Sequence, residues 1–168
     1  MLATIGYERA TLVDFIATLE LVGVDVLYDI REKAQSRRPG FSKTALSDAL
    51  TAAGIDYVHR PELGDPKAGR EAARAGNYRL FREVFSQVMN TTKANLALQE
   101  IETVAANRHV CLMCFERNQN ECHRKIVADF IETKLRLKAK HLGVVEGAAI
   151  DSAKRRMFHS DQGVTASF

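Results

Sequence analysis

Short apolar runs alternate along this chain with segments whose apolar residues recur at helical spacing. The runs have the length and composition of buried strands. We predict strands over four such segments: 2–6, 24–30, 55–59 and 110–115. Because helical patterns separate these strands, the chain is expected to adopt an α/β fold, as a single layered domain with a mostly parallel central sheet flanked by helices.

Capping residues mark where the helices between these strands begin and end. Thr11 is placed to cap a first helix that ends near Gly23, and Ser42 is placed to cap a second helix that ends before Gly54. Apolar spacing predicts three further helices: around 81–88, over 93–106 and over 122–137.

The composition fits one globular domain, with 46% hydrophobic and 27% charged residues in a chain of 168. We expect residues 1–147 to form this domain and residues 148–168, which lack a clear period, to form a peripheral or partly mobile tail. No apolar run approaches the roughly 20 residues of a membrane span, so no membrane partner is expected. Three cysteines, in a chain that does not begin like a signal peptide, argue against a disulfide framework and favour the cytoplasm.

Four loops hold almost all of the unusual polar residues of this sequence. They follow the predicted strands, at 7–11, 31–42, 59–69 and 116–122. Right-handed crossovers place such loops at one edge of a parallel sheet, and α/β proteins bind their ligands at that edge. The sequence therefore predicts a functional site there.

Two of the cysteines have C-x-x-C spacing, which occurs in redox and zinc pairs. Residues three apart on a strand point to opposite faces, so Cys111 and Cys114 are not expected to meet. Packing as small buried side chains is the simpler interpretation for both. Cys114 is expected to share a face with Glu116.

The third cysteine, Cys122, comes at the start of a helix after a polar turn. A helix N-terminus lowers the pKa of a thiol, and His123 and Arg124 would add to this effect. The trio is a candidate for a reactive thiolate, or for an anion site in which Arg124 pairs with a phosphate or carboxylate. The alternative is structural, with Cys122 as a cap and Arg124 in an ion pair.

Two charged residues, Asp29 and Arg31, share a face at the carboxyl end of a predicted strand. Such charges are costly to bury unless they are paired. We expect Asp29 to pair with Arg124, or Arg31 to pair with Glu116. Either pair would also organise a polar pocket.

The segment 31–43 carries five cations against one anion. Arg37 and Arg38 stand beside a Pro-Gly turn that is suited to holding a phosphate, and Phe41 is available for stacking on a base. A solvated basic loop is the alternative. His59, at the end of a strand, is a candidate acid, base or ligand, or else structural.

Four motifs occur in order along the chain: TIGYE, YDIR followed by SRRPGF, YVHRPELG, and C-x-x-C-x-E with a following CHR. Together, over about 3–145, they resemble a prokaryotic family catalogued as domain of unknown function 488. The resemblance implies an α/β fold, a shared polar site and a strand near 141–145, which gives about five strands. Two positions depart from the family: Tyr7-Glu8, usually a serine or a His-Ser pair, and Asp65, often a glycine. The matching positions are Arg31, Arg37 or Arg38, Pro39, Gly40, Phe41, His59, Glu116, Cys122, His123 and Arg124.

These observations favour an enzyme that acts on a phosphorylated ligand, with a nucleotide or nucleic acid as the expected partner. The candidate catalytic residues are Asp29, His59, Glu116, Cys122 and His123. The candidate anion-binding residues are Arg31, Arg37, Arg38 and Arg124. The candidates for stacking on the substrate are Tyr7 and Phe41.

Two alternatives stay open at this point. One is an anion-binding or nucleic-acid-binding module without catalysis. The other is a zinc protein with ligands from Cys114, Cys122, His123 and His59, although neighbouring residues such as Cys122 and His123 are awkward partners for one ion. No cofactor is expected, because nucleotide-binding glycine motifs are absent. No metal is expected, because the C-x7-C-H spacing is not a standard zinc pattern. The substrate and the oligomeric state are undetermined.

Overall fold

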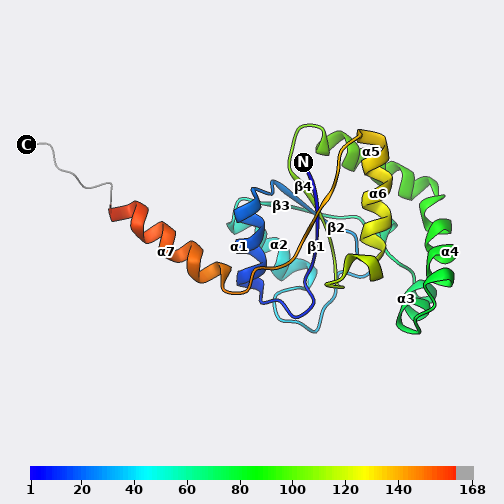
Figure 1. Ribbon diagram of the computed structural model, residues 1–168, viewed down its shortest axis with the longest axis horizontal. Coiled ribbons are helices and arrows are strands. Elements are labelled where there is room, and N and C mark those ends of the chain that lie inside the picture. Colours follow the sequence, from blue (N-terminus) through cyan, green and yellow to red (C-terminus); the bar gives the residue numbers. More distant parts are fainter. Residues whose placement is uncertain (162–168) are drawn as a thin grey trace, which may run out of the picture.

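A five-stranded sheet forms the centre of the molecule (Figure 1). The computed structural model describes residues 1–161. Every strand pair is parallel, and the strand order is β3-β2-β4-β1-β5, which confirms the predicted α/β class. The strands are β1 (Leu2–Gly6), β2 (Val26–Asp29), β3 (Asp56–His59), β4 (Val110–Cys114) and β5 (Lys140–Leu142).

The described residues also contain seven helices and two short 3₁₀ turns, all of which lie between strands except the last helix, which follows β5. As predicted, Thr11 caps the first helix through its side chain, and Gly23 ends that helix in the left-handed conformation. The helices are α1 (Leu12–Val22), α2 (Lys43–Ala52), α3 (Lys67–Arg74), α4 (Tyr78–Met89), α5 (Thr92–Ala105), α6 (His123–Leu135) and α7 (Ala148–Asp161), and the turns are η1 (Pro61–Leu63) and η2 (Gln119–Glu121).

Helices cover both faces of the sheet (Figure 1). The core against α1 and α2 includes Leu50 and, from β4, Cys111. The core against α5 and α6 includes Ile131 and, from β4, Leu112. Successive residues of β4 thus point to opposite faces, as a strand requires.

The register of the strands brings their carboxyl ends to one level. Cys114, the last residue of β4, lies opposite Gly6, the last residue of β1. Asp29, the last residue of β2, lies opposite Met113. The loops that leave these strands therefore meet at a single edge, as the sequence predicts.

Helix α3 occupies a segment where the sequence pattern indicated only a loop through Gly69. A β-carbon at Gly69 would collide with the carboxylate of Asp65, so the glycine makes room for this buried side chain. Because α3 buries little besides Gly69 and Ala72, it has almost no apolar stripe by which to recognise it.

Helix α7 forms in the segment that we expected to be a peripheral or partly mobile tail. It begins against α1, where the Ala149 backbone N–H donates to the Asp14 carboxylate over 3.0 Å, and it then points away from the sheet (Figure 1). A helix that packs on one neighbour needs few apolar residues, which explains its weak period. The rest of the predicted tail, 162–168, lies outside the described residues. None of the helices in residues 1–161 has the length and apolar content to cross a bilayer.

Candidate functional site

Two thiols and an imidazole converge at the carboxyl edge of the sheet. They belong to Cys114 at the end of β4, Cys122 at the N-cap of α6 and His123 in the first turn of α6. Their ligand atoms all lie within 4.8 Å of one another. His123 Nδ1 is 3.6 Å from Cys114 Sγ and 3.9 Å from Cys122 Sγ. We call these three residues the thiol–imidazole cluster.

The backbone at the helix start explains how neighbouring residues reach one point. Cys122 is extended, with φ −132° and ψ 143°, whereas His123 is the first helical residue. The change of direction turns both side chains toward Cys114. Cys122 Sγ also accepts a hydrogen bond from the Arg124 backbone N–H over 3.5 Å, so the thiol acts as the cap. Cys122 and His123 are therefore able to act as ligands of one ion although they are neighbours in sequence.

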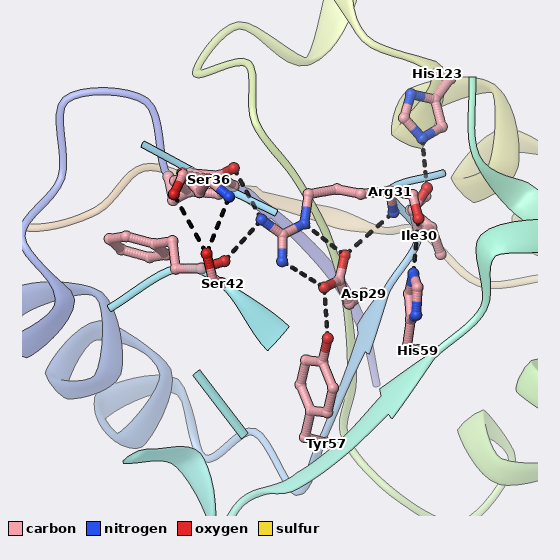
Figure 2. Close-up of polar contacts among 10 residues, drawn as sticks. Asp29, Ile30, Arg31, Ser36, Ser42, Tyr57, His59 and His123 are labelled. Carbon is pink, nitrogen blue, oxygen red and sulfur yellow. Dashed lines mark hydrogen bonds and ion pairs between the residues drawn. The ribbon is translucent and has the colours of Figure 1, made fainter. Parts of the chain in front are cut away.

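The orientation of the imidazole is fixed by a backbone carbonyl. His123 Nε2 donates to the oxygen of Ile30, just after β2, over 2.8 Å (Figure 2). Nδ1 then points at the two sulfur atoms. The ring of Phe85 packs beside it, with 5.2 Å between ring centroids. The ring thus offers one nitrogen to the cluster and uses the other to hold its position.

Electrostatics favour a charged pair in this cluster. Burial alone would raise the pKa of Cys122, but the hydrogen bond from Cys114 and the charges of His123 and Arg124 outweigh it and hold that pKa well below its usual range. Burial would lower the pKa of His123, but the Cys122 thiolate raises it to about 9. These opposite shifts favour a thiolate on Cys122 beside an imidazolium on His123.

A second acidic group borders the cluster on the side of the turn after β4. The Cys114 thiol donates to Glu116 Oε2 over 3.2 Å. Burial and the neighbouring Cys122 thiolate raise the pKa of Glu116 to about 7. Burial, Cys122 and Glu116 together raise the pKa of Cys114 well above its usual range. Cys114 therefore keeps its proton while Cys122 carries the charge.

Asp65, which sequence reasoning did not include among the site residues, is also buried near these groups. It is 6% exposed, and its Oδ1 has no hydrogen-bond partner within the described structure. Burial raises its pKa to about 6, although the charge of His123 acts in the opposite direction. The sequence held one sign of this role: Asp65 is an acidic residue at a position where the family that the chain resembles often has glycine.

The predicted ion pairs of Arg124 and Arg31 with the acidic residues across the edge are wrong. Arg124 is completely buried and donates to the carbonyl oxygens of Glu116 and Arg117 and to the Thr4 hydroxyl. It holds the turn after β4 in place instead of facing a ligand. A β-carbon at Gly6 would collide with the Glu116 carbonyl, so glycine is required for this close approach.

Asp29 and Arg31 pair with each other (Figure 2). Arg31 Nε and Nη2 donate to the two oxygens of Asp29 over 2.8 and 2.6 Å, and the Tyr57 hydroxyl donates to Asp29 Oδ2 over 2.6 Å. Arg31 Nη1 donates to the Tyr7 hydroxyl and to the Phe41 carbonyl. Burial would lower the pKa of Arg31, but Asp29 raises it. We call Asp29, Arg31 and Tyr57 the arginine cluster.

The two aromatic rings expected to stack on a substrate stack on each other. Tyr7 and Phe41 lie 4.4 Å apart between ring centroids, and both side chains are buried. Arg38 donates to the Ala10 carbonyl through Nε and Nη2. Of the predicted anion-binding residues, only Arg37 is exposed. The basic loop is therefore tied to the domain by its own cation and aromatic ring.

His59 lies apart from the thiol–imidazole cluster. Its Nε2 donates to the Arg31 carbonyl over 2.9 Å (Figure 2). It also lines an open groove of about 490 Å³ between α2 and the edge strand β3, which Lys43, Tyr57 and Arg60 line as well. The structure thus brings together three of the predicted catalytic residues, Glu116, Cys122 and His123, and it places His59 and Asp29 outside that group.

One comparison identifies a family for this chain. The family model described as "Domain of unknown function DUF488" matches residues 11–131, a range that includes the whole thiol–imidazole cluster. No curated protein and no solved structure matches the chain. Because the family match covers most of the sequence, the protein belongs to the DUF488 family.

Proposed function

We propose that this protein is a metal-binding protein whose thiol–imidazole cluster holds one thiophilic divalent ion, with zinc the best fit. The observation that carries the proposal is the convergence of Cys114 Sγ, Cys122 Sγ and His123 Nδ1 within 4.8 Å. Thiolate and imidazole are the ligands that zinc prefers in proteins.

The spacing of the donor atoms fits a tetrahedral zinc ion. Bond lengths of about 2.3 Å to sulfur and about 2.05 Å to nitrogen place a sulfur and a nitrogen ligand about 3.6 Å apart. The two distances from His123 Nδ1 are 3.6 Å to Cys114 Sγ and 3.9 Å to Cys122 Sγ. Both nitrogen–sulfur distances are thus within a few tenths of an ångström of the separation that a tetrahedral zinc ion requires.

The surroundings also suit a metal. Metal-binding histidines usually donate their second ring N–H to a carbonyl or carboxylate, as His123 does to Ile30. Cys122 needs no further deprotonation, because its pKa is already lowered by Cys114, His123 and Arg124 against the effect of burial. Only the Cys114 thiol and the imidazolium would release protons on binding.

The contacts of the arginine residues weigh against the enzyme for phosphorylated ligands that the sequence favoured. Arg31 and Arg124 are buried and donate to groups of the protein itself. Arg38 is committed to the Ala10 carbonyl. A phosphate would have to displace these partners, whereas a metal ion at the thiol–imidazole cluster displaces none of them. A catalytic role on another class of substrate is compatible with the metal proposal.

Zinc titration of chelator-treated protein, monitored by calorimetry, tests the proposal. We expect one zinc ion per chain, and we expect Cys122→Ser and His123→Ala to weaken zinc binding on the order of 100-fold or more. Cys111→Ala is the matched control, because Cys111 is buried on the opposite face of β4 and should leave zinc affinity unchanged. Equal binding by the wild type and both cluster variants would contradict the proposal.

A second function is favoured by one specific observation, the lowered pKa of Cys122 at the N-cap of α6. Without metal, a thiolate beside an imidazolium is a nucleophile. The two functions separate in one measurement, since a bound metal protects Cys122 from alkylation, whereas a metal-free catalytic thiol is alkylated with or without zinc.

A further inference from the structure

We infer that the metal centre keeps its fourth coordination position open to a small exogenous Lewis base, with the carboxylate of Glu116 beside that position. This inference rests on the proposed metal centre. It adds the class of molecule that the ion would meet: a substrate that presents a carbonyl, phosphoryl or hydroxyl oxygen. An open position of this kind would make the centre a reaction site, whereas a closed four-ligand site only stabilises the fold.

The cluster found in residues 1–161 offers three metal donors, from Cys114, Cys122 and His123. Structural zinc sites use four protein ligands, whereas catalytic sites use three and leave one position for water or substrate. Glu116 Oε2 is 3.2 Å from Cys114 Sγ, yet Glu116 is not part of the mutually close set. Glu116 is thus a neighbour of the cluster and lies too far from at least one donor to complete it.

The three donors belong to two neighbouring elements of the fold. Cys114 ends β4, Cys122 is the N-cap of α6, and His123 is the first residue of that helix. The Ile30 carbonyl, through a hydrogen bond, and the Phe85 ring, through packing, hold the His123 ring in position. The turn after β4, which carries the half-buried Glu116, borders the cluster on the side of Cys114. An incoming ligand would therefore meet the ion and this carboxylate together.

The three residues of the cluster are buried, but not completely. Cys114 is 5% exposed, Cys122 3% and His123 5%. Their neighbours Cys111 and Arg124 are 0% exposed, which places these two in the closed interior. Each of the three residues thus retains a small exposed fraction. The cluster is buried, but less completely enclosed than Cys111 and Arg124.

Cobalt-substituted protein tests this inference. Thiolate ligands give bound Co²⁺ an intense charge-transfer band, and its visible bands report the fourth ligand. We expect azide to shift the visible bands of the wild-type cobalt protein saturably while the charge-transfer band persists. Glu116→Ala should keep both the cobalt and the azide response. Glu121→Gln, in the same turn but exposed, is the matched control and should equal the wild type.

The outcomes separate this inference from the metal proposal. Cobalt binding with no azide response in the wild type overturns the open position and leaves the metal centre intact. If azide then acts only on Glu116→Ala, the carboxylate itself is the fourth ligand, and the inference is wrong in that specific way. Absence of the charge-transfer band contradicts the metal centre itself.

Discussion

The arginine cluster and the thiol–imidazole cluster occupy the same edge of the sheet, yet they differ in how their polar groups are satisfied. In the arginine cluster, Asp29 receives hydrogen bonds on both oxygens, and the guanidinium of Arg31 is bonded on all three nitrogens. In the thiol–imidazole cluster, the sulfur atoms make fewer and longer contacts: Cys114 donates to Glu116 over 3.2 Å, and Cys122 accepts from the Arg124 backbone N–H over 3.5 Å.

This difference distinguishes a structural cluster from a candidate reactive cluster at the same edge of the sheet. A buried ion pair with every bond filled fixes the loops around it but has nothing left to offer a ligand. Polarisable sulfur atoms with few hydrogen bonds keep their capacity to bind a ligand. The nearby acidic side chains have raised pKa values, Asp65 because of burial and Glu116 because of burial and the neighbouring Cys122 thiolate. Function is therefore expected at the incompletely bonded cluster. Three predictions test this contrast, from the largest effect to the smallest.

The largest effect is expected on removal of the anion from the arginine cluster. Asp29→Ala leaves Arg31 buried without its partner, so the free energy of unfolding should fall by about 3–5 kcal/mol. Urea denaturation measures this change. Asp56→Ala, which breaks an exposed ion pair with Arg108, should cost about 1 kcal/mol or less. Zinc stoichiometry should survive Asp29→Ala. Loss of zinc with little loss of stability would reverse the roles of the two clusters.

The second effect concerns Asp65, whose pKa burial raises to about 6. The folded state binds this proton more tightly than the unfolded state, whose ordinary pKa is about 3.9, so the ionised form opposes folding. Stability should therefore fall as pH rises from about 4 to about 6, by on the order of 2 kcal/mol.

Asp65→Asn isolates this contribution, because an amide does not ionise. The variant should be more stable than the wild type at pH 7, and the difference should vanish below about pH 4. Denaturation of metal-free protein across this pH range measures the difference curve. A constant difference at all pH values would show that Asp65 is not the group responsible.

The smallest effect is the difference in reactivity between two thiols of similar burial, Cys114 and Cys122. The pKa of Cys122 is lowered and that of Cys114 is raised, so Cys122 should carry the thiolate under conditions in which Cys114 is still protonated. In chelator-treated protein at pH 6, iodoacetamide should label Cys122 at least about tenfold faster than Cys114, as read by mass spectrometry. Equal, slow labelling of both until about pH 8.5 would contradict the assignment.

Sequence reasoning predicts the layers of this fold well, because strands and helices have distinct apolar periods. It also places Glu116, Cys122 and His123 at the right edge, since parallel strands share that edge. It fails for Phe41 and Tyr7, whose rings pack on each other, because aromatic side chains serve cores and substrates equally well. Whether a charge is free or paired depends on contacts across the sheet.

Cys114 illustrates the limit most clearly. The strand period correctly separates it from Cys111 and puts it beside Glu116. What the sequence does not show is the extended backbone at Cys122, which turns two adjacent side chains toward the same point. That local geometry is set by the turn before α6 and by the Ile30 carbonyl that holds His123, two features far apart in sequence.

The most direct test of the metal centre is X-ray absorption at the zinc edge of the zinc-loaded protein. The two thiols and one imidazole predict two sulfur atoms at about 2.3 Å, with the remaining ligands nitrogen or oxygen at about 2.0–2.2 Å. The Cys122→Ser variant should lose one sulfur from this shell. A first shell of nitrogen and oxygen alone, or zinc that the protein does not retain, would contradict the account.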